Sequence, residues 1–168
     1  MNNIADVSVG AVAHDSHPLD AIFRPRGVAL VGASERPGSV GRTVMWNLLS
    51  SPFGGTIYPV NQRRDNILGV RTYPTLADIP VRPDLVVICT PASSVPGILE
   101  EAVKLGIPGG IVISAGFKEA GPEGIALEHE IARITAGKMR IIGPNCLGVM
   151  NPVVGLNATF AARSANSG

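Results

Sequence analysis

The chain has 168 residues, of which 45% are hydrophobic and 16% charged, and its formal net charge is +1. This length suits a single domain with its own buried core. The near-zero charge argues against nucleic acid as a partner. No apolar run approaches the roughly 18 residues of a membrane span, and the first residues lack the basic and apolar regions of a signal peptide. We therefore expect a cytoplasmic protein with no membrane or nucleic-acid partner.

Short apolar runs alternate with helical patterns along most of the chain. Residues 1–18 are polar and unpatterned, which predicts a loose leader, and a helical turn over 19–23 opens the domain. The predicted strands cover 28–31, 56–60, 85–89, 110–113 and 140–142, and a short piece at 69–71 is compatible with a further strand. Runs rich in Val and Ile are typical of parallel strands buried on both faces.

Helical patterns fill the gaps between these strands, at 41–50, 94–105 and 122–136. For the second of them, Ser93 or Ser94 is the expected N-cap. The order predicts an α/β fold: a single Rossmann-like, doubly wound, mostly parallel sheet with helices on both faces. We expect this domain to cover 19–150, and residues 151–168 to form a linker or edge segment leading toward an absent second domain.

The stretch VALVGASERPGSVG, residues 28–41, carries a strand into a glycine-rich turn and then a helix. Its spacing is G-x5-G-x2-G, which differs from the G-x-G-x-x-G of a standard dinucleotide site. Glycines let backbone N–H groups approach an anion, and a helix N-terminus attracts negative charge. Arg36 and Ser39 offer further donors. The alternative is that these glycines only shape a tight turn.

The second strand ends in Asn61, where NAD-binding domains place a carboxylate for the adenosine ribose. Arg63 and Arg64 follow, and arginine suits a phosphate on that ribose. NADP carries such a phosphate on the 2′ position and coenzyme A (CoA) on the 3′ position. The alternative is a solvated loop shared with Asp65.

Six segments together resemble a known family: VALVGAS (28–34), IYPVN (57–61), LGVRTYPTLADIP (68–80), TPASSV (90–95), ISAGF (113–117) and IIGPNCLGVMNP (141–152). They are similar, in order, to the N-terminal CoA-binding domain of the nucleoside-diphosphate-forming acyl-CoA synthetases. That superfamily includes the succinyl-CoA synthetase alpha subunit and the ADP-forming acetyl-CoA synthetases. The same domain also occurs fused to GNAT acetyltransferases. The resemblance covers about residues 19–160.

The resemblance implies a CoA site made of the glycine loop and the ends of the later strands. The implied CoA-binding residues are Gly32, Ala33, Ser34, Arg36, Gly38, Ser39, Val40, Gly41, Asn61, Arg63, Thr90, Pro91, Ala92, Ser114, Ala115, Gly116 and Asn145. Two positions depart from the family pattern. Arg63 stands where such domains commonly have Lys, and Ala115 replaces the Glu of the succinyl-CoA relatives.

Catalytic residues are not expected in this chain. In the resembled synthetases a histidine of another domain is phosphorylated and an ATP-grasp unit supplies the phosphate. His14, His17 and His129 have no partner base or nucleophile in the pattern, and no metal-ligand cluster is visible. Cys146 follows a strand and is the rival nucleophile, although a structural or cofactor-lining role is favoured. Neither it nor Cys89 has CxxC spacing, which is typical of a reduced, intracellular protein.

Three hypotheses therefore stand. The first is a CoA-binding domain of an acid-thiol ligase that positions the CoA thiol for attack on an acyl phosphate formed by other domains. The second is a module that senses CoA or acyl-CoA, or the binding arm of an acetyltransferase. The third is an NADP-dependent oxidoreductase domain, which the long glycine loop and the lack of a catalytic Tyr-Lys pair disfavour.

Overall fold

The computed structural model describes residues 17–161, so the predicted leader lies outside the described residues except for its last two positions. Its helices and strands run in the order α1 (Asp20–Phe23), β1 (Gly27–Val31), α2 (Val40–Ser50), β2 (Thr56–Val60), β3 (Asn66–Ile67), β4 (Val70–Arg71), β5 (Leu85–Ile88), the 3-10 turn η1 (Ala92–Ser94), α3 (Val95–Lys104), β6 (Gly109–Val112), the 3-10 turn η2 (Lys118–Ala120), α4 (Pro122–Thr135), β7 (Arg140–Ile142), β8 (Gly148–Asn151) and β9 (Leu156–Thr159).

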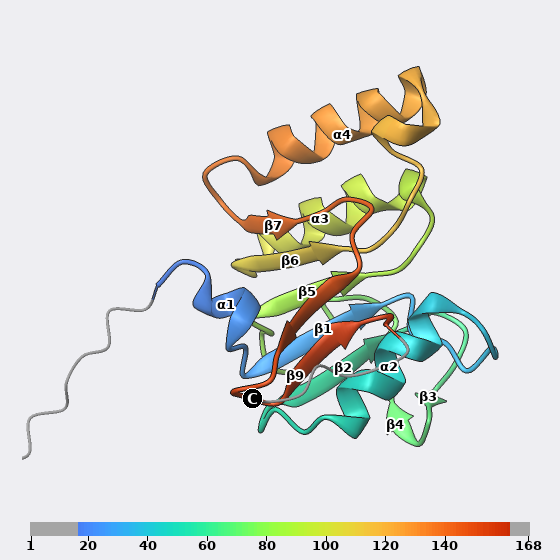
Figure 1. Ribbon diagram of the computed structural model, residues 1–168, viewed down its shortest axis with the longest axis vertical. Coiled ribbons are helices and arrows are strands. Elements are labelled where there is room, and N and C mark those ends of the chain that lie inside the picture. The colour runs from blue at the N-terminus through green and yellow to red at the C-terminus, as the bar shows by residue number, and fades with distance from the viewer. Residues whose placement is uncertain (1–16, 162–168) are drawn as a thin grey trace, which may run out of the picture.

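Five parallel strands form the central sheet in the order β2-β1-β5-β6-β7 (Figure 1). The predicted doubly wound α/β fold is confirmed, and each predicted strand of this sheet matches an observed one to within a residue at either end. The chain moves from β1 outward to β2 and then returns past β1 to β5. The order therefore reverses between β1 and β5, and a crevice opens at the carboxyl ends of strands at such a point.

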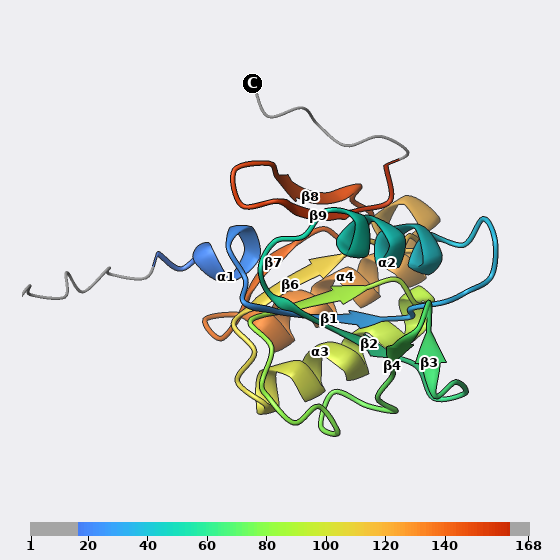
Figure 2. The same ribbon diagram turned by 90° about the horizontal axis from the view of Figure 1, so that it is seen from below.

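The two faces of the sheet carry separate cores. Val28 and Leu30 of β1 face α1, α2 and the β8–β9 hairpin, whereas Ala29 and Val31 face α3 and α4. Figure 2 shows α2 and the hairpin on one side of the sheet and α3 on the other. Because successive side chains of a strand point to opposite faces, continuous apolar runs such as Leu85–Ile88 are buried on both sides.

The end of the described chain is part of the fold. β8 and β9 pair as an antiparallel hairpin that packs on α2, and Leu156 and Ala158 are fully buried there. Asn47 of α2 donates from Nδ2 to the carbonyl oxygens of Thr159 at 2.8 Å and Ala161 at 3.0 Å. The segment expected to be a linker or edge thus contributes a buried strand and a hydrogen-bonded end.

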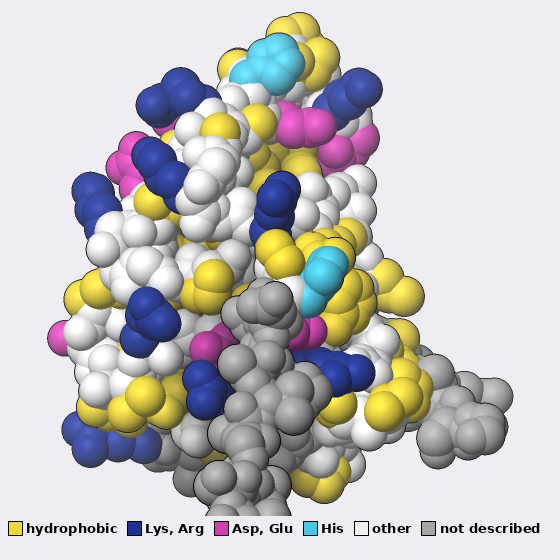
Figure 3. Space-filling model, turned by 90° about the vertical axis from the view of Figure 1, so that its left-hand side faces the viewer, with side chains coloured by type: hydrophobic (Ala, Val, Ile, Leu, Met, Phe, Trp, Pro, Cys, Tyr) yellow, Lys and Arg dark blue, Asp and Glu magenta, His cyan; other side chains and the backbone are white. Residues whose placement is uncertain are grey.

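Charges are dispersed over the edge at the amino ends of the strands. On this face Lys and Arg side chains lie among Asp and Glu side chains and apolar patches (Figure 3). Within residues 17–161 no helix has the length and apolar content to cross a membrane.

Candidate functional site

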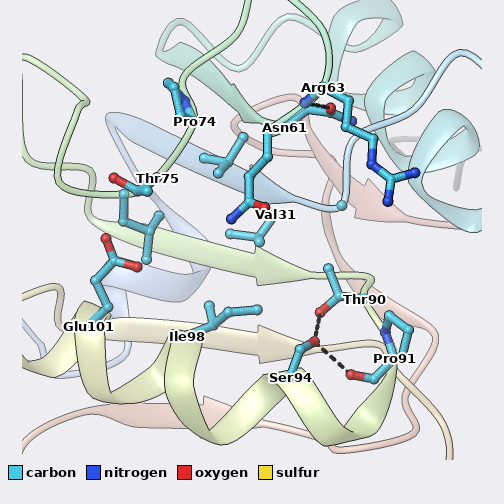
Figure 4. A pocket seen from close by; sticks show the side chains of 14 residues that line it. Val31, Asn61, Arg63, Pro74, Thr75, Thr90, Pro91, Ser94, Ile98 and Glu101 are labelled. Carbon is cyan, nitrogen blue, oxygen red and sulfur yellow. Dashed lines mark hydrogen bonds between the residues drawn. The ribbon is translucent and has the colours of Figure 1, made fainter.

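A groove of about 570 Å³ opens at the point where the strand order reverses. Its walls are the loops after β1, β2 and β5, the segment 74–76, and one side of α3 (Figure 4). Five of the expected site residues line it: Gly32, Asn61, Arg63, Thr90 and Pro91. Residues distant in sequence therefore meet where the strand order predicts a ligand site.

Gly32 allows the loop after β1 to approach the loop after β5. Its φ is +90°, a conformation that favours glycine. A Cβ at this position would lie 3.0 Å from Thr90 Cγ2 and 3.1 Å from the carbonyl carbon of Cys89. Any larger residue would therefore force these two loops apart.

Asn61 joins the glycine loop to the turn after β2. Its Nδ2 donates to the Ala33 carbonyl at 2.9 Å, and its Oδ1 accepts from the Arg63 amide at 2.8 Å. A carboxylate has no donor for that carbonyl. The amide in place of the carboxylate of an NAD site is therefore explained by the packing of this loop.

The two neighbouring arginines have different surroundings. Arg64 lies 3.1 Å from the carboxylate of Glu35, whose other oxygen accepts from the Leu68 amide at 3.0 Å. Glu35 thus ties the glycine loop to the β3–β4 hairpin. Arg63 makes no ion pair within the described part of the chain, and its exposed side chain stands at the mouth of the groove. Of the two, Arg63 is the cation open to a ligand.

The hydroxyl groups of the glycine loop are used within the loop. Ser34 Oγ accepts from the Arg36 amide at 3.0 Å, and Ser39 Oγ donates to the Arg36 carbonyl at 2.8 Å. Ser39 also caps α2 by accepting from the Arg42 amide. Arg42 Nε is buried and has no hydrogen-bond partner among residues 17–161. Arg42 lines neither of the hollows at this sheet edge, so the feature at the start of α2 that favours an anion is the helix N-terminus.

The side chain of Ser94 makes no capping hydrogen bond to α3 and instead contacts the residues that line the groove. Its Oγ donates to the Pro91 carbonyl at 2.7 Å and pairs with Thr90 Oγ1 at 2.8 Å (Figure 4). Ser94 occupies the N-cap position of α3, as expected, but its side chain makes no capping hydrogen bond, because a 3-10 turn precedes α3 and Ser94 has helical backbone angles. The bonds instead fix the Thr90–Pro91 wall.

A second hollow, of about 410 Å³, continues along the carboxyl edge toward β6 and β7. It shares Thr90 and Pro91 with the groove, and five further expected site residues line it: Arg36, Val40, Ser114, Ala115 and Asn145. The remaining expected residues line neither hollow: Ala33, Ser34, Gly38, Ser39, Gly41, Ala92 and Gly116. Most of these shape the turns that place the others.

Glu119, which the sequence did not single out, lies beside the second hollow. One of its oxygens accepts from the Gly116 amide at 2.6 Å and the Phe117 amide at 3.2 Å. These hydrogen bonds, led by that from Gly116 and joined by the Asn145 side chain, lower the pKa of the exposed carboxyl. An acidic group therefore does lie at this edge, although Ala115 itself supplies none.

The two cysteines lie close to the second hollow and are protonated at neutral pH. Burial, with a smaller effect of Cys146, raises the pKa of Cys89 to about 12. Burial also raises the pKa of Cys146, whose thiol donates to the Val112 carbonyl at 3.3 Å. His129 is exposed on α4 and lines neither hollow, and His14 is outside the described residues. The geometry favours a lining role for Cys146 over a nucleophilic one.

The family follows from a comparison with protein-family models. Residues 26–152 match the CoA binding domain model. The chain belongs to the CoA-binding domain family. Because the match spans β1 to β8, it includes every lining residue of the groove and all those of the second hollow except Phe160.

Several relatives of this CoA-binding domain are ADP-forming ligases. It is 42% identical over 151 residues to an acetate–CoA ligase [ADP-forming] I of Archaeoglobus fulgidus, covering 89% of this chain and 22% of the relative. It is 44% identical over 146 residues to an acetate–CoA ligase [ADP-forming] of Methanocaldococcus jannaschii, covering 86% of this chain and 20% of the relative. The chain therefore spans about a fifth of the length of these relatives.

A solved structure of a similar protein shares the fold. It is an acetyl-coenzyme A synthetase 1 of Ca. Korarchaeum cryptofilum, described as dinucleotide forming and solved in complex with phosphate and ADP. The TM-score is 0.84 and the identity 38%, over 89% of this CoA-binding domain and 32% of the synthetase chain. The CoA-binding domain corresponds to about a third of that chain.

The thiols of this CoA-binding domain are expected to react slowly. Alkylation needs the thiolate, and at pH 8 a group with a pKa of about 12 is almost wholly protonated. Iodoacetamide should modify Cys89 at least about tenfold more slowly than free cysteine, and Cys146 should also be slowed. Peptide mass spectrometry of timed samples measures both rates, with guanidinium-unfolded protein as the fast control. Rapid labelling of native Cys146 would instead support the nucleophile hypothesis.

The Glu119 carboxylate is expected to stabilise the CoA-binding domain except in acid. Its pKa is lowered by folding, so its contribution is complete above the ordinary carboxyl pKa and is lost as the pH falls through the lowered, folded-state value. Glu119→Gln should therefore have a lower melting temperature than wild type at pH 7, and this difference should shrink in acid. Thermal melts from pH 7 to pH 3 measure it. A difference that stays constant across this range would contradict the prediction.

Proposed function

We propose that this chain is the CoA-binding domain of a nucleoside-diphosphate-forming acyl-CoA synthetase, an acid-thiol ligase. The observation that carries the proposal is that the groove and the second hollow lie next to each other at one sheet edge and share Thr90 and Pro91 as lining residues. A long ligand with a nucleotide at one end and a thiol arm at the other suits two neighbouring hollows at one sheet edge. The similar ADP-forming ligases support the same reading.

The charges and the volumes of the two hollows are compatible with a bound CoA molecule. The groove would take the nucleotide end, with Arg63 at the ribose phosphate. The diphosphate would lie against the glycine loop and the N-terminus of α2, whose backbone N–H groups favour an anion. The thiol arm would follow the second hollow past Ser114 and Asn145. Gly32, which has no Cβ, lets the loop after β1 approach the loop after β5 between these regions.

Binding and orientation are the proposed tasks of this chain's own residues. When bound, CoA supplies a thiol nucleophile for an acyl phosphate formed by other domains. Those domains, including an ATP-grasp unit, are the proposed partners, and the chain alone is proposed to be non-catalytic. The free thiols Cys89 and Cys146 support a reducing, cytoplasmic setting.

Calorimetric titration of the purified chain tests this proposal. CoA should bind with a 1:1 stoichiometry, whereas NADP should give no saturable heat, because the groove ends in Asn61 and a loop built differently from a dinucleotide site. Binding of NADP with no response to CoA would overturn the proposal and support an oxidoreductase domain. Addition of CoA to the chain should also raise its melting temperature.

A further inference from the structure

The groove has a basic end and an acidic end. Arg63 stands at its mouth, at the carboxyl ends of the strands, and Glu101 projects from α3 on the far side (Figure 4). Between them lie the apolar side chains of Val31, Leu76 and Ile98. A ligand that fills this groove therefore meets a cation at one end, an apolar middle, and a carboxylate at the other end.

Glu101 is held in place by one of its two oxygens. Its Oε1 accepts from the Ala77 amide at 3.0 Å, which links α3 to the loop after β4. No group within the described part of the chain donates to the other oxygen, Oε2. The nearby Thr75 does not compete for it, because its amide and hydroxyl both donate to Asp78 Oδ2, at 3.0 Å and 2.8 Å. The groove thus presents a fixed oxygen that only accepts hydrogen bonds.

We infer that Glu101 determines specificity for the base of the bound nucleotide by accepting a hydrogen bond from the 6-amino group of adenine. This inference rests on the proposed CoA binding and adds an orientation to it. With the ribose phosphate at Arg63, the base extends over Val31 and Ile98 toward Glu101. The exocyclic amine is the donor that an adenine offers at its outer edge, and it would meet the Oε2 atom.

We expect the groove to select its ligand by the identity of the base as well as by the phosphate on the ribose. A site that holds a polar group for a ligand donor rejects an analogue that lacks the donor, because the site's own group is then left without its partner. One such contact corresponds to about a tenfold difference in Kd. Removing the amine from CoA should therefore cost affinity even though the analogue is smaller.

The test compares CoA with an analogue whose base is purine, without the 6-amino group, by calorimetry on the whole chain. Wild type should bind CoA about tenfold more tightly than the analogue. Glu101→Gln keeps an oxygen for the Ala77 amide but turns an N–H₂ donor toward the base. This variant should bind both ligands within about twofold of each other. Its melting temperature should stay close to that of wild type, because the bond to Ala77 remains.

Glu100→Gln is the matched control, since Glu100 is an exposed neighbour on α3 that does not line the groove. It should keep the tenfold preference for CoA. Equal affinity of wild type for the two ligands, or an unchanged preference in Glu101→Gln, would overturn the inference while leaving CoA binding intact. Absence of CoA binding to wild type would instead overturn the proposed function. Equal affinity of wild type for the two ligands would overturn the inference even if the Glu101→Gln variant did not fold.

Discussion

Arg63→Ala is expected to weaken CoA binding by about 10- to 100-fold while leaving dephospho-CoA binding within about threefold of wild type. The reason is that Arg63 faces the groove without an ion-pair partner among the described residues, so its guanidinium is available to the 3′-phosphate. A charge-assisted hydrogen bond contributes roughly 1.5–3 kcal/mol, and each 1.4 kcal/mol is about tenfold in Kd. Calorimetric titration with both ligands measures the ratio.

Arg64→Ala provides the control at the neighbouring position. Arg64 is paired with Glu35 and acts on the glycine loop, so its loss should change the affinities for CoA and dephospho-CoA by the same factor. Raising the salt concentration should weaken CoA binding to wild type more than to Arg63→Ala. If Arg63→Ala lost both ligands equally, the contact would belong to the diphosphate rather than to the ribose phosphate.

Gly41→Ala is expected to lower the free energy of unfolding by about 3 kcal/mol and to impair CoA binding at the same time. A Cβ at Gly41 would lie only 2.0 Å from the Gly32 carbonyl oxygen, because the first turn of α2 packs directly on the glycine loop. Either α2 or the loop must move. For a chain of this size the loss corresponds to roughly 6–12 °C in melting temperature, measurable by circular dichroism or calorimetry.

Gly97→Ala is the matched control, because it makes the same glycine-to-alanine change in α3, another helix that packs on the central sheet. A Cβ at Gly97 meets no atom within 4 Å, so alanine's better helix propensity should raise the stability by about 0.5–1 kcal/mol. CoA affinity should stay unchanged. Equal stability of Gly41→Ala and wild type would show that the close approach of α2 to Gly32 is not required.

The sheet could be predicted from sequence because its strands are short, apolar and separated by helical patterns. The hairpin at the end of the domain could not. In β9 the polar Asn157 and Thr159 are as buried as Leu156 and Ala158, since Thr159 Oγ1 donates to Asn157 Oδ1 at 2.8 Å. Apolar and polar residues alternate along β9. Such alternation is typical of an edge strand with one exposed face, although here both kinds of residue are buried.

The lining of the two hollows could be predicted best where it follows strand ends. Loops such as 32–41 and 90–92 reach one edge of a parallel sheet by topology alone, which is why Gly32 and Thr90 meet at the groove. Glu101 lies inside a helix, and its place in the groove depends on how α3 packs against the loop at Ala77. Glu119 depends similarly on the backbone of its own turn. Neither the contact of Glu101 with Ala77 nor that of Glu119 with Gly116 follows from a residue spacing in the sequence.

The β8–β9 hairpin decides where this domain can be joined to another. The family match ends at residue 152, between the two strands. A fusion junction placed there would strip Leu156 and Ala158 from the core over α2 and leave Asn47 without its carbonyl acceptors. A junction after Ala161 would keep them. We therefore expect a stable module of this domain to include the hairpin.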